Sequence, residues 1–168
     1  MTPRWVLLSG FVLLLSGLQD SQPFNQRPAD VTIVISTSRG GYDGQYTTSN
    51  VAQVCGEVPK EMNFAGVPTF IVQFPDAADG EVQNVAFRSP VLIGTTTTTT
   101  SFMLNVGVKS PRIGAPPIYV LDTAQPKMSG KATLASPSPG TTQLTVEGVN
   151  DKSETIHMTV TCGPRSRG

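Results

Sequence analysis

The chain has 168 residues, of which 12 are basic and 12 acidic, so its formal net charge is zero. Charged residues make up only 14% of the chain and are scattered along it, which excludes the basic footprint expected for binding nucleic acid or an anionic membrane surface. Sixteen glycines, 14 prolines and recurrent Thr and Val favour strands and turns over helices.

Residues 1–21 have the three parts of a secretory signal: Arg4 near the start, an apolar run from Trp5 to Leu15, and a polar stretch. The apolar run is too short to span a bilayer, which needs about 20 residues. We expect cleavage between Gly17 and Ser21 and a secreted or periplasmic mature chain without a transmembrane segment. Leu18 stands where a lipobox needs its cysteine, so lipid anchoring by that route is not expected.

The first strands are expected soon after an extended lead-in at residues 22–29. Residues 30–37 form a strand in which Val31, Ile33 and Ile35 share one face. A turn cluster at 39–44 precedes a second strand over 46–54. The pattern from 56 to 68 is irregular, and we expect a loop with at most one helical turn beginning at Pro59.

The middle of the chain predicts a strand over 69–74 and then a long hairpin. Apolar residues alternate before Gly94 and again after it, so each arm has one apolar face. Pro90 must lie at an edge or a bulge. Between the arms, residues 95–100 are six consecutive threonines. They could be an O-glycosylated or an ice- or surface-binding array, but we favour a β-branched strand start whose hydroxyls face solvent or a neighbouring strand.

The last third predicts a strand over 118–121 and a three-stranded meander over 131–135, 142–147 and 154–162. In the final strand Ile156, Met158 and Val160 share their face with Cys162. Residues 163–168 are expected to form a flexible tail.

Cys55 and Cys162 are the only cysteines, and in an oxidising compartment they most simply form one disulfide. Closing a loop of about 100 residues is worth roughly 4 to 5 kcal/mol in the chain-entropy model. A redox pair or metal site has little support, because there is no Cys-x-x-Cys and only His157 could add a soft ligand.

About eight short strands without a normal helix predict an all-β fold. We expect residues 30–162 to form a single antiparallel two-sheet sandwich, immunoglobulin-like or a related Greek key, with a small β-barrel as the alternative. The Cys…Trp…Cys pattern of true immunoglobulin domains is missing, so the prediction concerns architecture only.

The residues that could carry chemistry are few. His157 is the only histidine and lies opposite the expected core face, with no nucleophile motif nearby. Asp76, Asp79 and Glu81 cluster in one turn and are weak calcium candidates, because their spacing does not match an EF-hand loop. We expect no catalytic residues, no cofactor and no metal.

Tyr42 and Tyr46 are the candidate ligand-binding residues, because residues four apart on an extended chain share a face and could stack on a sugar ring. They could instead cover a sheet edge with their hydroxyls in water. We therefore expect an exported, monomeric, non-catalytic binding or structural module of the cell envelope or extracellular space, with a protein or glycan partner. The alternatives are a carbohydrate-binding module using the two tyrosines and, more weakly, a carboxylate-dependent hydrolase.

Overall fold

The computed structural model describes residues 26–36, 43–62, 68–74, 81–90, 96–109 and 118–164. These residues form eleven strands and one short 3₁₀ helix, η1 (Lys60–Met62). The strands are β1 (Arg27–Ser36), β2 (Gly44–Ala52), β3 (Val54–Val58), β4 (Thr69–Phe74), β5 (Val82–Ser89), β6 (Thr96–Thr99), β7 (Met103–Val108), β8 (Ile118–Asp122), β9 (Ser129–Ala135), β10 (Thr142–Val149) and β11 (Thr155–Cys162). Within the described residues, no helix has the length and apolar character needed to cross a membrane.

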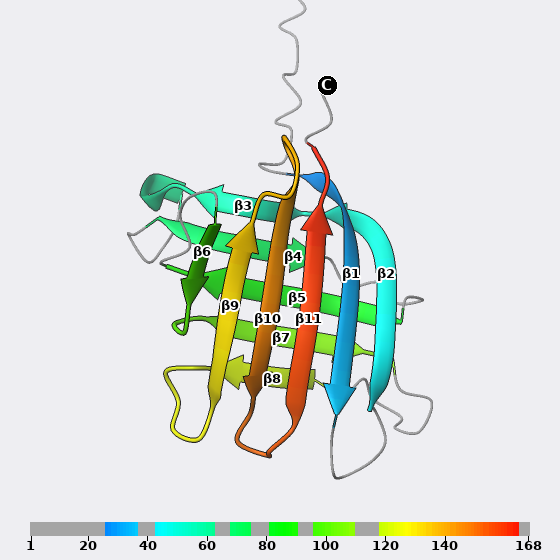
Figure 1. Ribbon diagram of the computed structural model, residues 1–168, viewed down its shortest axis with the longest axis vertical. Coiled ribbons are helices and arrows are strands. Elements are labelled where there is room, and N and C mark those ends of the chain that lie inside the picture. The colour runs from blue at the N-terminus through cyan, green and yellow to red at the C-terminus, as the bar shows by residue number, and fades with distance from the viewer. Residues whose placement is uncertain are drawn as a thin grey trace, which may run out of the picture.

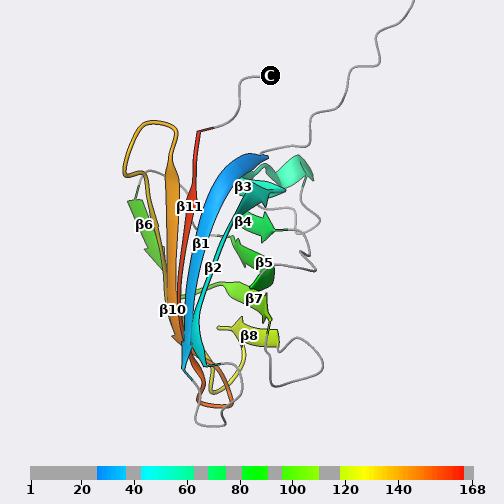
Figure 2. The same ribbon diagram turned by 90° about the vertical axis from the view of Figure 1, so that its right-hand side faces the viewer.

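The strands form two antiparallel sheets packed face to face. The six-stranded sheet has the order β2-β1-β11-β10-β9-β6, and the five-stranded sheet has the order β3-β4-β5-β7-β8. The strands of one sheet run across those of the other (Figure 1), and the two layers are seen edge-on in Figure 2. The two-sheet sandwich is thus confirmed, and the sheets do not close into a barrel. Their crossed packing differs from the aligned sheets of immunoglobulin domains.

Alternation along the strands supplies the core between the sheets. In β1, Val31, Ile33 and Ile35 are buried and their odd-numbered face packs inward, as predicted. Ile33 pairs with Met158 of β11, so the first and last strands lie side by side within the six-stranded sheet, between β2 and β10. Strand β1 begins at Arg27, three residues before the predicted start.

The chain changes sheets between β2 and β3. Strand β2 ends at Ala52 in the six-stranded sheet, and β3 begins at Val54 in the other. At this corner Gln53 donates its N–H to the carbonyl of Gln73 at 2.8 Å. The predicted loop beginning at Gly56 is therefore wrong in its first part, because residues through Val58 pair with β4.

The predicted hairpin is confirmed as the antiparallel pair of β5 and β7, in which Phe87 lies opposite Leu104. The threonine run between its arms does not extend the hairpin. Instead β6 joins the other sheet beside β9, with Thr98 opposite Thr133. Strands β3 and β6 are additional to the predicted ones, and the observed total of eleven exceeds the expected number of about eight.

The C-terminal meander is confirmed as β9, β10 and β11, and the disulfide is confirmed between Cys55 and Cys162. Their Cα atoms are 6.5 Å apart, and both side chains are buried in the core cluster. Because β3 and β11 belong to different sheets, the disulfide joins the two layers covalently. The predicted signal at 1–21 and residues 165–168 of the predicted tail lie outside the described residues.

Candidate functional site

The outer face of the six-stranded sheet carries a row of threonines that crosses every strand. The pairing registers place one threonine of each strand opposite the next. In spatial order from β2 to β6 the row is Thr47, Thr32, Thr159, Thr145, Thr133 and Thr98. We call these six residues the threonine row.

The threonine row results from strand periodicity combined with register. Thr32 lies between buried Val31 and Ile33, and Thr145 lies between buried Leu144 and Val146, so both side chains point away from the core. The two end residues are exposed and the inner four are half-buried. Neighbouring strands are about 4.8 Å apart, so five intervals extend the row over about 24 Å.

Hydrogen bonds between side chains tie parts of this face together. Thr98 Oγ1 lies 3.3 Å from Thr133 Oγ1 on the adjacent strand, as the strand interpretation of the threonine run predicts. In the next row Ser49 donates its hydroxyl to Asp30 Oδ1 at 2.6 Å. The amide of Gln143 donates to Thr161 Oγ1 at 3.3 Å in that same row. The face therefore presents hydroxyl and amide groups in register.

On the other side of the threonine row lies a row that contains the charged side chains Glu147, His157 and Lys131. His157 Nδ1 is 3.2 Å from Glu147 Oε1, and the two side chains are 50% and 62% exposed. The predicted position of His157, opposite the core face, is thus observed. This pair lies on an open sheet surface, where water has access to both groups.

Three shallow hollows lie on the same outer face. The central one, of about 250 Å³, is lined by six side chains of β9 and β10 that include Thr133, Thr145 and Gln143. A second hollow of about 450 Å³ lies beside His157 and Val34, and a third of about 430 Å³ lies beside Asp30 and Thr161. The threonine row therefore crosses one shallow hollow and has another on each side.

Tyr46, predicted as a ligand-binding residue, lies at the margin of the sandwich. It is opposite Ile33 and packs partly buried against the core cluster, so its ring belongs to the inner side of β2. Burial raises the pKa of its hydroxyl, and the nearby carboxylates of Asp43 and Glu81 raise it further. Tyr42 lies outside the described residues, so the paired platform stays a prediction.

The calcium candidates are also only partly described. Asp76 and Asp79 lie outside the described residues. Glu81 Oε2 accepts the backbone N–H of Thr47 at 3.2 Å, which caps a donor on the edge strand β2. In the described part of the chain, no three His, Cys, Asp or Glu side chains gather in a way that could hold a metal ion.

Sequence reasoning identified the threonine run at 95–100 but missed the threonine row. Only Thr98 of the row comes from that run; the other five come from five separate strands. Each of these threonines occupies an outward position of an alternating strand, which is a visible but weak signal. Their alignment depends on six strands and their registers.

Together these features describe a disulfide-linked, two-sheet β-sandwich with a threonine-rich outer face. Comparisons with protein-family models, with curated proteins and with solved structures found no match to the chain.

Proposed function

We propose that the protein is an exported, non-catalytic binding module, and that the outer face of its six-stranded sheet binds an extended, neutral polysaccharide. The observation that carries this proposal is the threonine row, which places one threonine on each of six adjacent strands.

The chemistry of threonine suits such a ligand. Each hydroxyl can donate one hydrogen bond and accept two, and each methyl group offers a small apolar contact beside it. A sugar ring likewise presents hydroxyls at its rim and C–H groups on its faces. Because the hydroxyls repeat at the strand spacing of about 4.8 Å, a repetitive polymer can make the same contact several times along the row.

The charge distribution favours a neutral polymer over an anionic one. The threonine row contains no ionisable side chain, and the two flanking rows carry both signs, with Asp30 on one side and Lys131 and Glu147 on the other. A polyanion would gain little from this surface, because the opposite charges largely cancel. Hydroxyl-to-hydroxyl contacts do not require a net field.

Export is supported by the secretory pattern of residues 1–21 and by the disulfide, since disulfides persist in oxidising compartments. The same environment is where extracellular or envelope polysaccharides occur. Export and glycan binding are thus mutually consistent parts of the proposal.

The experiment is affinity electrophoresis in gels containing hydroxyethyl cellulose, xylan or mannan. We expect retardation of the mature protein by at least one polymer. The double variant T145V/T159V removes two central hydroxyls while keeping β-branched shape and strand propensity, and it should lose most of the retardation. The matched control is Gln73→Val, which also replaces a polar side chain by valine but lies on the other sheet. This variant should migrate like the wild type.

Two outcomes would contradict the proposal. One is no retardation by any polymer, and the other is equal retardation of the wild type and T145V/T159V. Loss of binding in Tyr42→Ala but not in the threonine variant would favour the tyrosine platform instead. Release of new reducing ends from any of the polymers would favour a hydrolase.

A further inference from the structure

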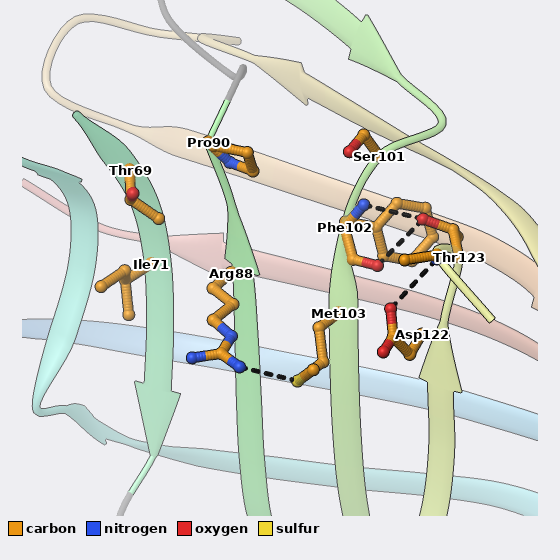
Figure 3. Close-up of a pocket in the computed structure, with 10 residues that line it drawn as sticks. Thr69, Ile71, Arg88, Pro90, Ser101, Phe102, Met103, Asp122 and Thr123 are labelled. Atoms are coloured by element: carbon orange, nitrogen blue, oxygen red, sulfur yellow. Dashed lines mark hydrogen bonds between the residues drawn. The ribbon is translucent and has the colours of Figure 1, made fainter. Parts of the chain in front are cut away.

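The outer face of the five-stranded sheet contains a groove of about 400 Å³. It lies near the start of β4, the end of β5, the start of β7 and the turn that follows β8. Figure 3 shows its walls: Thr69 and Ile71 come from β4, Arg88 and Pro90 from β5 and just beyond it, and Met103 from β7. The groove lies on the opposite side of the sandwich from the threonine row.

The floor of the groove is apolar and rests on the core. Ile71 and Met103 lie on the two sides of Arg88 in one cross-strand row. Beneath this row, on the inner face of the sheet, the buried ring of Phe102 packs against Phe87 with the ring centroids 5.6 Å apart. An apolar ligand body placed here would leave water for a surface that is already supported from below.

The wall formed after β8 is held by hydrogen bonds. The Thr123 hydroxyl donates to the Phe102 carbonyl at 3.0 Å and accepts the Phe102 N–H at 2.9 Å, while the Thr123 N–H donates to the same carbonyl at 3.1 Å. On β5, Ser89 donates its hydroxyl to the Ser101 carbonyl at 2.8 Å. These bonds fix the groove before any ligand arrives, which reduces the entropic cost of binding.

Arg88 supplies the charge of the groove. Its side chain is exposed, and Nη2 donates to Met103 Sδ at 3.2 Å. Thioether sulfur is a weak acceptor, and a guanidinium has five N–H donors. Arg88 forms no ion pair with any residue that the structure describes, so most of its donors face solvent beside an apolar floor.

Asp122 lies on the far side of Met103 from Arg88 in the same cross-strand row. Its Oδ1 accepts the Ala124 N–H at 3.1 Å and its Oδ2 accepts the Gln125 amide at 3.3 Å. Both carboxylate oxygens of Asp122 thus accept hydrogen bonds from the turn that follows β8. Figure 3 shows the hydrogen bond to the chain just after Thr123. The positive charge of the groove is therefore that of Arg88, between Ile71 and Met103.

We infer that this groove binds a small organic anion with an apolar body. Its carboxylate or phosphate head accepts hydrogen bonds from Arg88, and its apolar body contacts the flanking side chains of Ile71 and Met103. Guanidinium can bind either head group through two parallel hydrogen bonds. The inference does not depend on the proposed glycan binding, because the two surfaces belong to different sheets.

Two-dimensional ¹H–¹⁵N NMR of the full mature protein, titrated with monomeric sodium decanoate, tests the inference. We expect saturable shifts confined to the amides around Ile71, Arg88, Met103 and Thr123. Decanol, which has the same chain without the charge, should bind at least about tenfold more weakly, the loss expected for a hydrogen bond to a charged group. Arg88→Met should reduce decanoate affinity by a similar factor.

The matched control is Lys131→Met, which removes an exposed cation from the other sheet and should leave decanoate binding unchanged. Cosedimentation with phosphatidylglycerol vesicles and with phosphatidylcholine vesicles identifies the source of the head group. If the protein binds phosphatidylglycerol vesicles but not phosphatidylcholine vesicles, and Arg88→Met abolishes this binding, the ligand is a lipid. If the protein binds decanoate but neither kind of vesicle, the ligand is a free small molecule. Absence of saturable shifts at the groove, or equal decanoate affinity in the wild type and Arg88→Met, would overturn the inference.

Discussion

The guanidinium of Arg27 donates a hydrogen bond to the carbonyl of Cys55 at 3.3 Å, and this contact joins the first strand of the six-stranded sheet to the five-stranded sheet. Arg27 is only 7% exposed. It also donates to the carbonyls of Cys162 at 3.4 Å and Gly163 at 2.6 Å, to the carbonyl of Gly140, and to the Thr142 hydroxyl at 3.0 Å. A buried cation and the disulfide therefore stabilise the same corner of the sandwich.

Replacing Arg27 by methionine should lower the free energy of unfolding by about 2 to 4 kcal/mol, because several partly buried carbonyls lose a charged donor. Arg27→Lys should recover only part of the loss, since a single ammonium cannot reach acceptors spread across a planar fork. Urea unfolding followed by circular dichroism measures both variants. The exposed Lys131→Met serves as a control and should change stability by less than about 0.5 kcal/mol. Equal stability of wild type and Arg27→Met would contradict the role given to Arg27.

The disulfide closes a loop with a sequence separation of 107 residues. The double variant C55A/C162A, which leaves no free thiol, should lose about 2 to 5 kcal/mol of stability. Both cysteines are at most 1% exposed, so dithiothreitol should reduce the disulfide slowly until the protein unfolds. Urea midpoints of the oxidised protein, the reduced protein and the double variant test this. Identical midpoints would show that the disulfide adds no stability.

Gly148 of β10 faces Leu121 of the other sheet. It pairs with Gly130 of β9, and a Cβ added at 148 would meet Leu121 of β8 and lie 2.9 Å from the Ser129 carbonyl. Because one of these contacts is backbone, Gly148→Ala should cost about 1 to 3 kcal/mol through overpacking. Differential scanning calorimetry should show a clearly lower Tm. The exposed neighbour Ser129 offers a control: Ser129→Ala should leave the Tm nearly unchanged, and a similarly unchanged Tm in Gly148→Ala would refute the steric argument.

Tyr46 gives a prediction about alkaline pH. Burial, with Asp43 and Glu81, raises the pKa of its hydroxyl above the ordinary value of 10.0. The folded state therefore keeps this proton at pH values where the unfolded chain has lost it. The stabilising contribution is complete below about pH 10 and is lost as the pH rises through the folded pKa.

Unfolding in urea at pH 8, 9, 10 and 11 should consequently show a steeper loss of stability for the wild type than for Tyr46→Phe, which cannot ionise. Below pH 9 the difference in stability between the two proteins should not vary with pH. Parallel curves across the whole range would mean that the Tyr46 environment does not favour the neutral phenol.

Local pattern in the sequence was sufficient for much of the fold. The alternation of Val31, Ile33 and Ile35, and that of Ile156, Met158 and Val160, correctly predicted which faces are buried, because a strand places every second side chain on the same side. The disulfide followed from having only two cysteines in a chain with a secretory pattern. The part around Cys55 was predicted incorrectly, since a five-residue strand that begins a new sheet has too few alternating positions to be recognised.

Residue type and short-range periodicity were thus sufficient to predict the class of structure, its buried faces and its covalent link. Which strands are neighbours depends on the tertiary structure. In the folded protein β6 belongs to the other sheet and not to the hairpin, Thr47 and Thr98 are the two ends of one row, and Arg27 contacts Cys55. These relationships join residues far apart in the chain, and they are fixed by register and sheet packing, which require every strand to bury its apolar face at once.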